Sequence, residues 1–210
     1  MNPHQRLIRL RTLFCKRIMR LKNAALSDPK NAERFALISI SQLNNFLRAY
    51  LLSIRNGAID SAGNAISYSA TYSSDAFLID EIMKFGQYKK WRNITPVGNM
   101  IGRWTEKDEP AYHTPRIFLL VVNGLAPANL TAITTALTDS WKIDILRSVR
   151  NYYAHRSKHT EDFAIIEAKR KYSILGLRGH GVLLEYDSRI RNIIIEDISD
   201  YLIAFATNIT

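Results

Sequence analysis

The chain has 210 residues, of which 47% are hydrophobic and 23% charged, with 9 Gly and 6 Pro. This composition excludes disordered, collagen-like and low-complexity proteins, and a chain of this length buries a core without covalent staples. The single cysteine, Cys15, excludes an internal disulfide framework and a zinc site built from several cysteines. A lone cysteine fits a reducing compartment, and we expect a cytoplasmic protein.

The charge balance is strongly basic. Lysine and arginine total 29 against 19 acidic residues, which gives a formal net charge of +10. Such a charge favours a polyanionic partner, with nucleic acid ahead of an acidic protein or a merely solvated surface. The longest compact apolar run extends from Ile117 to Val122, far short of the ~20 residues that a membrane helix needs. We therefore expect no membrane partner.

The first quarter of the chain predicts two helices. Apolar residues at helical spacing predict an amphipathic helix over residues 6–26, whose other face is basic and either solvated or in contact with phosphates. Asp28 suits a helix cap and Pro29 the first position of a second helix. Gly57 is suited to end that helix after Arg55 and Asn56.

Residues 57–115 are loop-rich and are predicted to be an insertion. Within them, residues 75–85 have a helical pattern, whereas residues 86–115 are irregular. The irregular part combines tryptophan and tyrosine with lysine and arginine, for example at Trp91 and Arg92. Such a segment either stacks bases and contacts phosphates or packs against the edge of a core.

The remainder of the chain is predicted to be mainly helical. Residues 115–123 form either a buried helix or a strand, because so short an apolar run fits both. Helices are predicted over residues 127–138, 140–153, 161–172 and 196–207. The fold class is therefore mostly all-α: one helical domain over residues 1–210 with a loop-rich insertion.

One segment carries a candidate site. Arg150 and Asn151 are followed by three residues and then by His155, at the end of a predicted amphipathic helix. This pattern resembles the HEPN family (higher eukaryotes and prokaryotes nucleotide-binding), whose signature is R-x(4–6)-H, often with a polar residue after the arginine. The resemblance implies a HEPN-like helical bundle and a ribonuclease-type activity.

The residue types suit RNA cleavage without a metal or another cofactor. A histidine exchanges protons near neutral pH, and the planar fork of an arginine holds a phosphate. His155 is expected to handle protons at the attacking 2′-hydroxyl or the leaving 5′-oxygen, and Arg150 to stabilise the charge on the pentavalent phosphorane. Asn151 is expected to orient one of them or to bind phosphate. The neighbouring basic residues Arg147, Arg156 and Lys158 are candidates for RNA binding.

Spacing imposes a constraint on this site. Five residues along a continuous helix correspond to a turn of ~140° and a rise of ~7.5 Å, so Arg150 and His155 converge poorly within one chain. Either the helix breaks near Tyr153 or two chains complete the site, as the family resemblance implies for a homodimer. In some family members the motif continues as H-x-Y, with a tyrosine two residues after the histidine. In this chain Arg156 and Ser157 follow His155, so that tyrosine is missing.

Three functional hypotheses follow. The first is a metal-independent endoribonuclease acting as a homodimer on RNA, in a bacterial toxin or anti-phage defence system with a cognate antitoxin or partner protein. The second is a catalytically inactive HEPN-like module that binds RNA, nucleotide or protein. The third is a helical adaptor whose basic face meets an acidic protein. The alternative to a functional site is that His155 caps or packs the helix end and that Arg150 is an exposed partner for Asp144 or Glu161.

Overall fold

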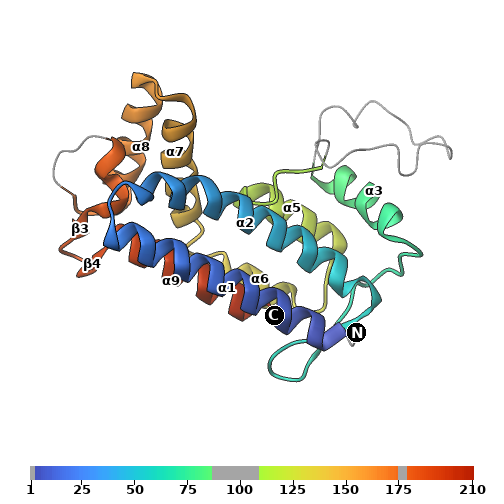
Figure 1. Ribbon diagram of the computed structural model, residues 1–210. Helices are drawn as coiled ribbons and strands as arrows, with labels where there is room; N and C mark the ends of the chain where they lie inside the picture. The colour runs from blue at the N-terminus through green and yellow to red at the C-terminus, as the bar shows by residue number, and fades with distance from the viewer. Residues whose placement is uncertain (1–2, 87–108, 175–178) are drawn as a thin grey trace. The chain divides into compact units, whose positions relative to one another are not determined.

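The computed structural model describes residues 3–86, 109–174 and 179–210 of the protein (Figure 1). These residues are mostly helical, which confirms the all-α prediction. Their α-helices are α1 (Pro3–Ser27), α2 (Asn31–Ser53), α3 (Asp75–Phe85), α5 (Pro115–Leu125), α6 (Leu130–Ala136), α7 (Trp141–His155), α8 (Lys158–Lys171) and α9 (Ile194–Ile209). The described residues also contain two 3-10 turns, η1 (Ile54–Asn56) and η2 (Gly179–Leu184), and two short antiparallel hairpins, β1 (Ala58–Ile59) with β2 (Ala65–Ile66) and β3 (Tyr186–Asp187) with β4 (Asn192–Ile193).

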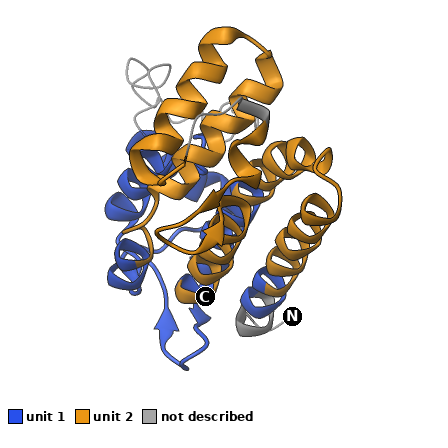
Figure 2. Cartoon of the chain, turned by 90° about the vertical axis from the view of Figure 1, so that its left-hand side faces the viewer, with its two compact units in different colours: residues 1–11, 44–135, 209–210 blue, residues 12–43, 136–208 orange. Residues whose placement is uncertain are grey.

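The chain divides into two compact units, which Figure 2 colours separately. One unit comprises residues 1–11, 44–135 and 209–210, and the other comprises residues 12–43 and 136–208. The long helices α1 and α2 each contribute residues to both units. The second unit contains the whole Arg150–His155 segment, so the candidate site belongs to it.

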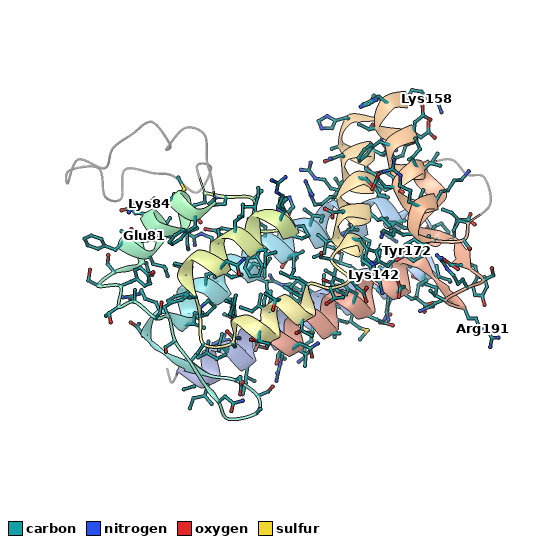
Figure 3. All side chains as sticks on the ribbon, turned by 180° about the vertical axis from the view of Figure 1, so that it is seen from behind. Glu81, Lys84, Lys142, Lys158, Tyr172 and Arg191 are labelled. Atoms are coloured by element: carbon teal, nitrogen blue, oxygen red, sulfur yellow. The ribbon has the colours of Figure 1, made fainter. Side chains whose placement is uncertain are left out.

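In the second unit, α7 and α8 form an antiparallel hairpin joined by two residues (Figure 1). At the open end of this hairpin, Asp197 of α9 accepts hydrogen bonds from Lys142 Nζ at 2.8 Å and from Tyr172 Oη at 2.7 Å. Figure 3 shows Lys142 and Tyr172 close together there. Burial, and then the bond to Asp197, raise the pKa of Tyr172, so its hydroxyl remains a donor. Both ends of the hairpin sequence are thereby fastened to α9.

In the first unit, a buried carboxylate holds α2 to the segment before α5. The side chain of Glu109 is 3% exposed, and Arg48 donates to its two oxygens from Nε and Nη2, each at 2.7 Å. Tyr112 Oη donates to the same carboxylate at 2.9 Å. A buried charge is tolerated when it is paired in this way, and truncating either partner would leave an uncompensated ion.

The predicted helices agree with the structure apart from details at their ends. Residues 115–123 belong to a helix, and Pro115 occupies its first turn. Pro29 lies in a turn before α2 instead of starting it, because the backbone N–H of Asn31 donates to the carbonyl of Asp28. Asp28 does cap this turn, since its Oδ1 accepts from the backbone N–H of Lys30 at 3.1 Å. The described part of the predicted insertion contains β1, β2 and α3, whereas residues 87–108, with the basic and aromatic residues around Trp91, lie outside the described residues.

Candidate functional site

The helix α7 presents the motif on a rigid element. Its apolar residues cover a wide stripe, and the buried side chains are Ile143, Ile145, Leu146, Ser148, Val149 and Tyr153. Burial of such a stripe, more than intrinsic propensity, holds a helix of this length in place. The opposite face of α7 is open, and Asn151 and His155 are both exposed there.

The end of α7 is set by its last residues. Arg156 adopts a left-handed conformation with φ 51°, and its backbone N–H donates to the carbonyl of Tyr152 at 2.7 Å. The side chain of Ser157 then accepts from the backbone N–H of Thr160 at 3.2 Å and caps α8. His155 is therefore the final helical residue of α7, directly before a tight turn.

The helix does not break near Tyr153. It continues through His155, so the alternative in which a helix break near Tyr153 brings Arg150 and His155 together is wrong. The continuous helix arises because Tyr153 is buried, at 6% exposure, and extends the apolar stripe into the last turn. Within one chain, Arg150 and His155 thus stand about 140° apart around the helix axis.

A hydrogen bond reduces this separation. Arg150 donates from Nη1 to Oδ1 of Asn151 at 3.1 Å. Asn151 precedes His155 by four residues, so their side chains lie on one face of α7. The bond consequently brings the guanidinium toward the face of α7 that carries His155, although the Cα–Cβ bond of Arg150 points to a different side of the helix.

The six predicted site residues separate into two groups by their partners. The three predicted RNA-binding residues all pair with carboxylates: Arg147 with Asp144 at 2.8 Å, Arg156 with Glu33, and Lys158 with Asp162 at 2.8 Å and Glu161 at 3.7 Å. Among the described residues, no carboxylate pairs with Arg150 or His155. The alternative in which Arg150 pairs with Asp144 or Glu161 therefore has no support in the contacts of these two acids.

The three ion pairs do not remove their cations from possible use. The side chains of Arg156 and Lys158 are well exposed, at 51% and 76%, and that of Arg147 is partly exposed, at 32%. Exposed pairs contribute about 0–1 kcal/mol, so a polyanion can compete for such cations at little cost. Their charges are nevertheless compensated in the absence of a ligand, whereas Arg150 has no carboxylate partner among the residues that the structure describes.

Arg156 also covers the two tyrosines of the motif. Its guanidinium carbon lies 5.1 Å from the ring centre of Tyr153 and 5.8 Å from that of Tyr152. Burial, and then the negative charge of Glu33, raise the pKa of Tyr153 to about 12, against a smaller lowering by Arg156. This tyrosine is therefore neutral at physiological pH and serves the packing of the turn.

Sequence reasoning did not find Glu33. This residue of α2 pairs with Arg156 across 123 positions of the chain, and no local pattern connects the two. The sequence signal was limited to an acidic residue in the first turn of a predicted helix, where it also stabilises the helix dipole. The pair joins α2 to the turn that follows His155.

Further surveys of the described residues are negative. No three His, Cys, Asp or Glu side chains in these ranges gather as a metal site would require. None of the helices found in the described ranges is long and apolar enough to cross a membrane. No protein-family model, curated protein or solved structure matches this chain.

Proposed function

We propose that the protein is a metal-independent endoribonuclease of the HEPN type that acts as a homodimer. One observation carries the proposal: Arg150, Asn151 and His155 share the exposed end of one helix, linked by the bond between Arg150 and Asn151. Arg150 and His155 pair with no carboxylate among the described residues, so their guanidinium and imidazole groups are available to bind a phosphate. The net charge of +10 favours a polyanionic substrate.

The proposed chemistry needs two copies of the motif. One His155 removes the proton of a ribose 2′-hydroxyl, whose oxygen attacks the adjacent phosphorus. The bond from phosphorus to the 5′-oxygen breaks, and the partner's His155 gives that oxygen a proton. The products are a 2′,3′-cyclic phosphate and a 5′-hydroxyl. Arg150 stabilises the added negative charge on the phosphoryl oxygens in the transition state.

A dimer can place an arginine and a histidine in one cleft, which the helix geometry of a single chain does not do. Because the helix separates Arg150 from His155 by about 140°, a single motif gives half a site. Two-fold symmetry brings a second arginine and a second histidine to the same cleft. Light scattering during gel filtration is expected to give about twice the mass of the chain, and a monomer at tens of micromolar would count heavily against the assignment.

Cleavage of a defined single-stranded RNA tests the activity. Arg150→Ala and His155→Ala are each expected to lower the rate by more than about 100-fold, because a dimer loses both copies. His159→Ala is the matched control, since this exposed histidine lies in the first turn of α8, outside the motif. Circular dichroism and the unfolding midpoint show whether each variant remains folded.

Two further cleavage experiments test the proposed mechanism. Cleavage is expected to survive EDTA, since none of the proposed steps uses a metal. RNA with a 2′-O-methyl group at the scissile position is expected to resist, since its nucleophile is blocked. A folded His155→Ala variant that cuts at the wild-type rate, or methylated RNA cut at the same bond, would refute the proposal.

A catalytically inactive HEPN-like module is the second candidate. It is favoured by the poor convergence of Arg150 and His155 in a single continuous helix. In that case the wild-type protein binds RNA, nucleotide or a partner protein without cutting. The proposed biological setting is a bacterial toxin or anti-phage defence system in the cytoplasm, with a cognate antitoxin or defence partner, and it rests on the HEPN resemblance.

A further inference from the structure

The outer face of α1 is a separate basic surface within the second unit. The inner face of this part of the helix is buried through Phe14, Ile18 and Ala25. Lys16 and Arg20, one helical turn apart, are exposed on the outside. Their Cα atoms are about 6 Å apart along the axis, which suits contact with successive phosphates of one strand.

The charge of this face is uncompensated. The sequence contains no acidic residue before Asp28, although it has seven lysines and arginines in the same stretch: Arg6, Arg9, Arg11, Lys16, Arg17, Arg20 and Lys22. Lys22 pairs with Asp200 at 3.3 Å, and Arg17 donates to Gln42 at 2.6 Å. Within the described part of the chain, Lys16 and Arg20 make no ion pair or side-chain hydrogen bond. They differ in this from Arg147, Arg156 and Lys158, whose charges are neutralised.

Apolar residues on the same helix decide between two kinds of polyanion. Leu13 is 45% exposed, Met19 42% and Leu26 37%. Met19 and Leu26 are seven residues apart and lie on one line along the helix, but Leu13 is about 120° away from Met19, so the three do not form one continuous apolar face. A helix that lies in a lipid surface needs a continuous apolar face to insert, and that face of α1 is already in the protein core. A nucleic acid backbone requires only the exposed cations.

We propose that the outer face of α1, centred on Lys16 and Arg20, binds the phosphate backbone of RNA without reading its sequence. The choice of RNA as the polyanion rests on the proposed function. The face extends substrate binding beyond the motif on α7 and adds cations that pair with no carboxylate in the described part of the chain. Sequence-independent contacts of this kind depend strongly on salt, because each phosphate contact releases counterions.

The test measures binding, not cleavage. Fluorescence anisotropy with a fully 2′-O-methylated single-stranded RNA gives the dissociation constant at several salt concentrations. Lys16→Gln together with Arg20→Gln is expected to weaken binding roughly tenfold at low salt and to reduce the slope of log K against log salt by about 1.4, or about 0.7 for each lost contact. Both side chains are exposed, so the unfolding midpoint should not change.

Lys30→Gln with Arg34→Gln is the matched control. This pair also comprises an exposed lysine and an exposed arginine four residues apart, but it lies at the start of α2. The control is expected to leave the salt slope nearly unchanged. Equal losses in both double variants would indicate a general charge effect and overturn the proposal, as would unchanged RNA affinity in the α1 variant.

Other outcomes identify a different occupant. Vesicles of phosphatidylserine and phosphatidylcholine that bind the wild-type protein but not the α1 variant, with RNA affinity unaltered, would assign the face to lipid and overturn the proposal. If RNA binding depends on α1 but the wild-type protein never cleaves RNA, the face stands and the enzyme assignment fails. If cleavage occurs and the α1 variant binds as the wild type does, the enzyme assignment stands and the face is wrong.

Discussion

Arg150 donates a hydrogen bond to Asn151 at 3.1 Å, and through this bond its guanidinium is held on the side of α7 that carries His155. The two residues are neighbours in sequence, so their Cα–Cβ directions diverge by about 100° around the helix. By accepting the hydrogen bond, the amide oxygen of Asn151 brings the guanidinium of Arg150 part of the way toward its own side of the helix. If the protein is the proposed ribonuclease, Asn151 is a positioning residue for Arg150, and its contribution to cleavage should depend on the presence of the arginine.

A double-mutant cycle tests this dependence. Asn151→Ala is expected to lower kcat/KM for RNA cleavage by about tenfold, or about 1.4 kcal/mol, which is the usual contribution of one hydrogen bond to a charged group. In the Arg150→Ala background, the same change is expected to have almost no further effect. Additive losses would show that Asn151 contacts the substrate on its own. His159→Ala serves as the control and is expected to be additive.

The sequence predicts α7 better than it predicts what surrounds it. The helical spacing of Ile145 and Val149 indicates an apolar stripe, and both residues are buried. The same spacing continues from Ile145 and Val149 to Tyr152 and predicts that it is buried, whereas Tyr153 is the buried tyrosine, because the helix packs over a wider arc than one row of residues. Elements of two residues such as β1 contain too few positions for a periodic signal, and the sequence did not predict them.

The polar contacts of the site lie beyond sequence reasoning for a different reason. The composition shows that carboxylates are scarce but not which cations they pair with. Glu33 pairs with Arg156 because α2 and the turn after α7 meet in the fold. Asp144, in contrast, pairs with Arg147 three residues later on the same helix, where spacing alone predicts the contact.

Buried tyrosines predict a loss of stability at alkaline pH. The pKa of Tyr153 is raised to about 12, mainly by burial, while an unfolded tyrosine titrates near 10. The folded state thus holds the phenolic proton more tightly, so the stabilisation is complete below about pH 10 and is lost as the pH rises towards 12. For one such group, the free energy of unfolding falls by up to about 1.4 kcal/mol per pH unit in that window.

Urea unfolding between about pH 9 and pH 11.5 measures this effect. Tyr153→Phe is expected to make the alkaline decline less steep by the share of one group, because the phenylalanine has no proton to lose while other buried tyrosines such as Tyr50 and Tyr201 keep their raised pKa values. Tyr186→Phe is the control, since Tyr186 is 56% exposed, and it is expected to leave the decline as in the wild type. The same pH dependence in the wild type and in Tyr153→Phe would contradict the assignment.

Gly124 marks a close approach of two helices in the first unit. A Cβ atom added to Gly124 of α5 would lie 2.2 Å from Cγ of Phe85 in α3. Helix propensity alone favours alanine over glycine by about 1 kcal/mol, but overpacking a rigid ring costs about 1–3 kcal/mol. Gly124→Ala is therefore expected to lower the free energy of unfolding, as urea titration would show. With Phe85→Ala in the background, which removes the clashing Cγ and Cδ atoms, the same change should become neutral or stabilising, and destabilisation of equal size there would rule out the clash as its cause.

Arg156 provides the last prediction, because its backbone conformation and its side chain can be separated. Arg156→Gly and Arg156→Ala both remove the ion pair with Glu33 and the contact with the ring of Tyr153. They differ in the Cβ atom, which is unfavourable at φ 51° by about 1 kcal/mol. The glycine variant is therefore expected to be the more stable of the two by about that amount in urea unfolding.

At Arg20, in the interior of α1, the order should reverse, with alanine more stable than glycine by about 1 kcal/mol. If alanine were favoured at both positions, the turn after His155 would not be left-handed in solution, and the placement of His155 as the final residue of α7 would be wrong.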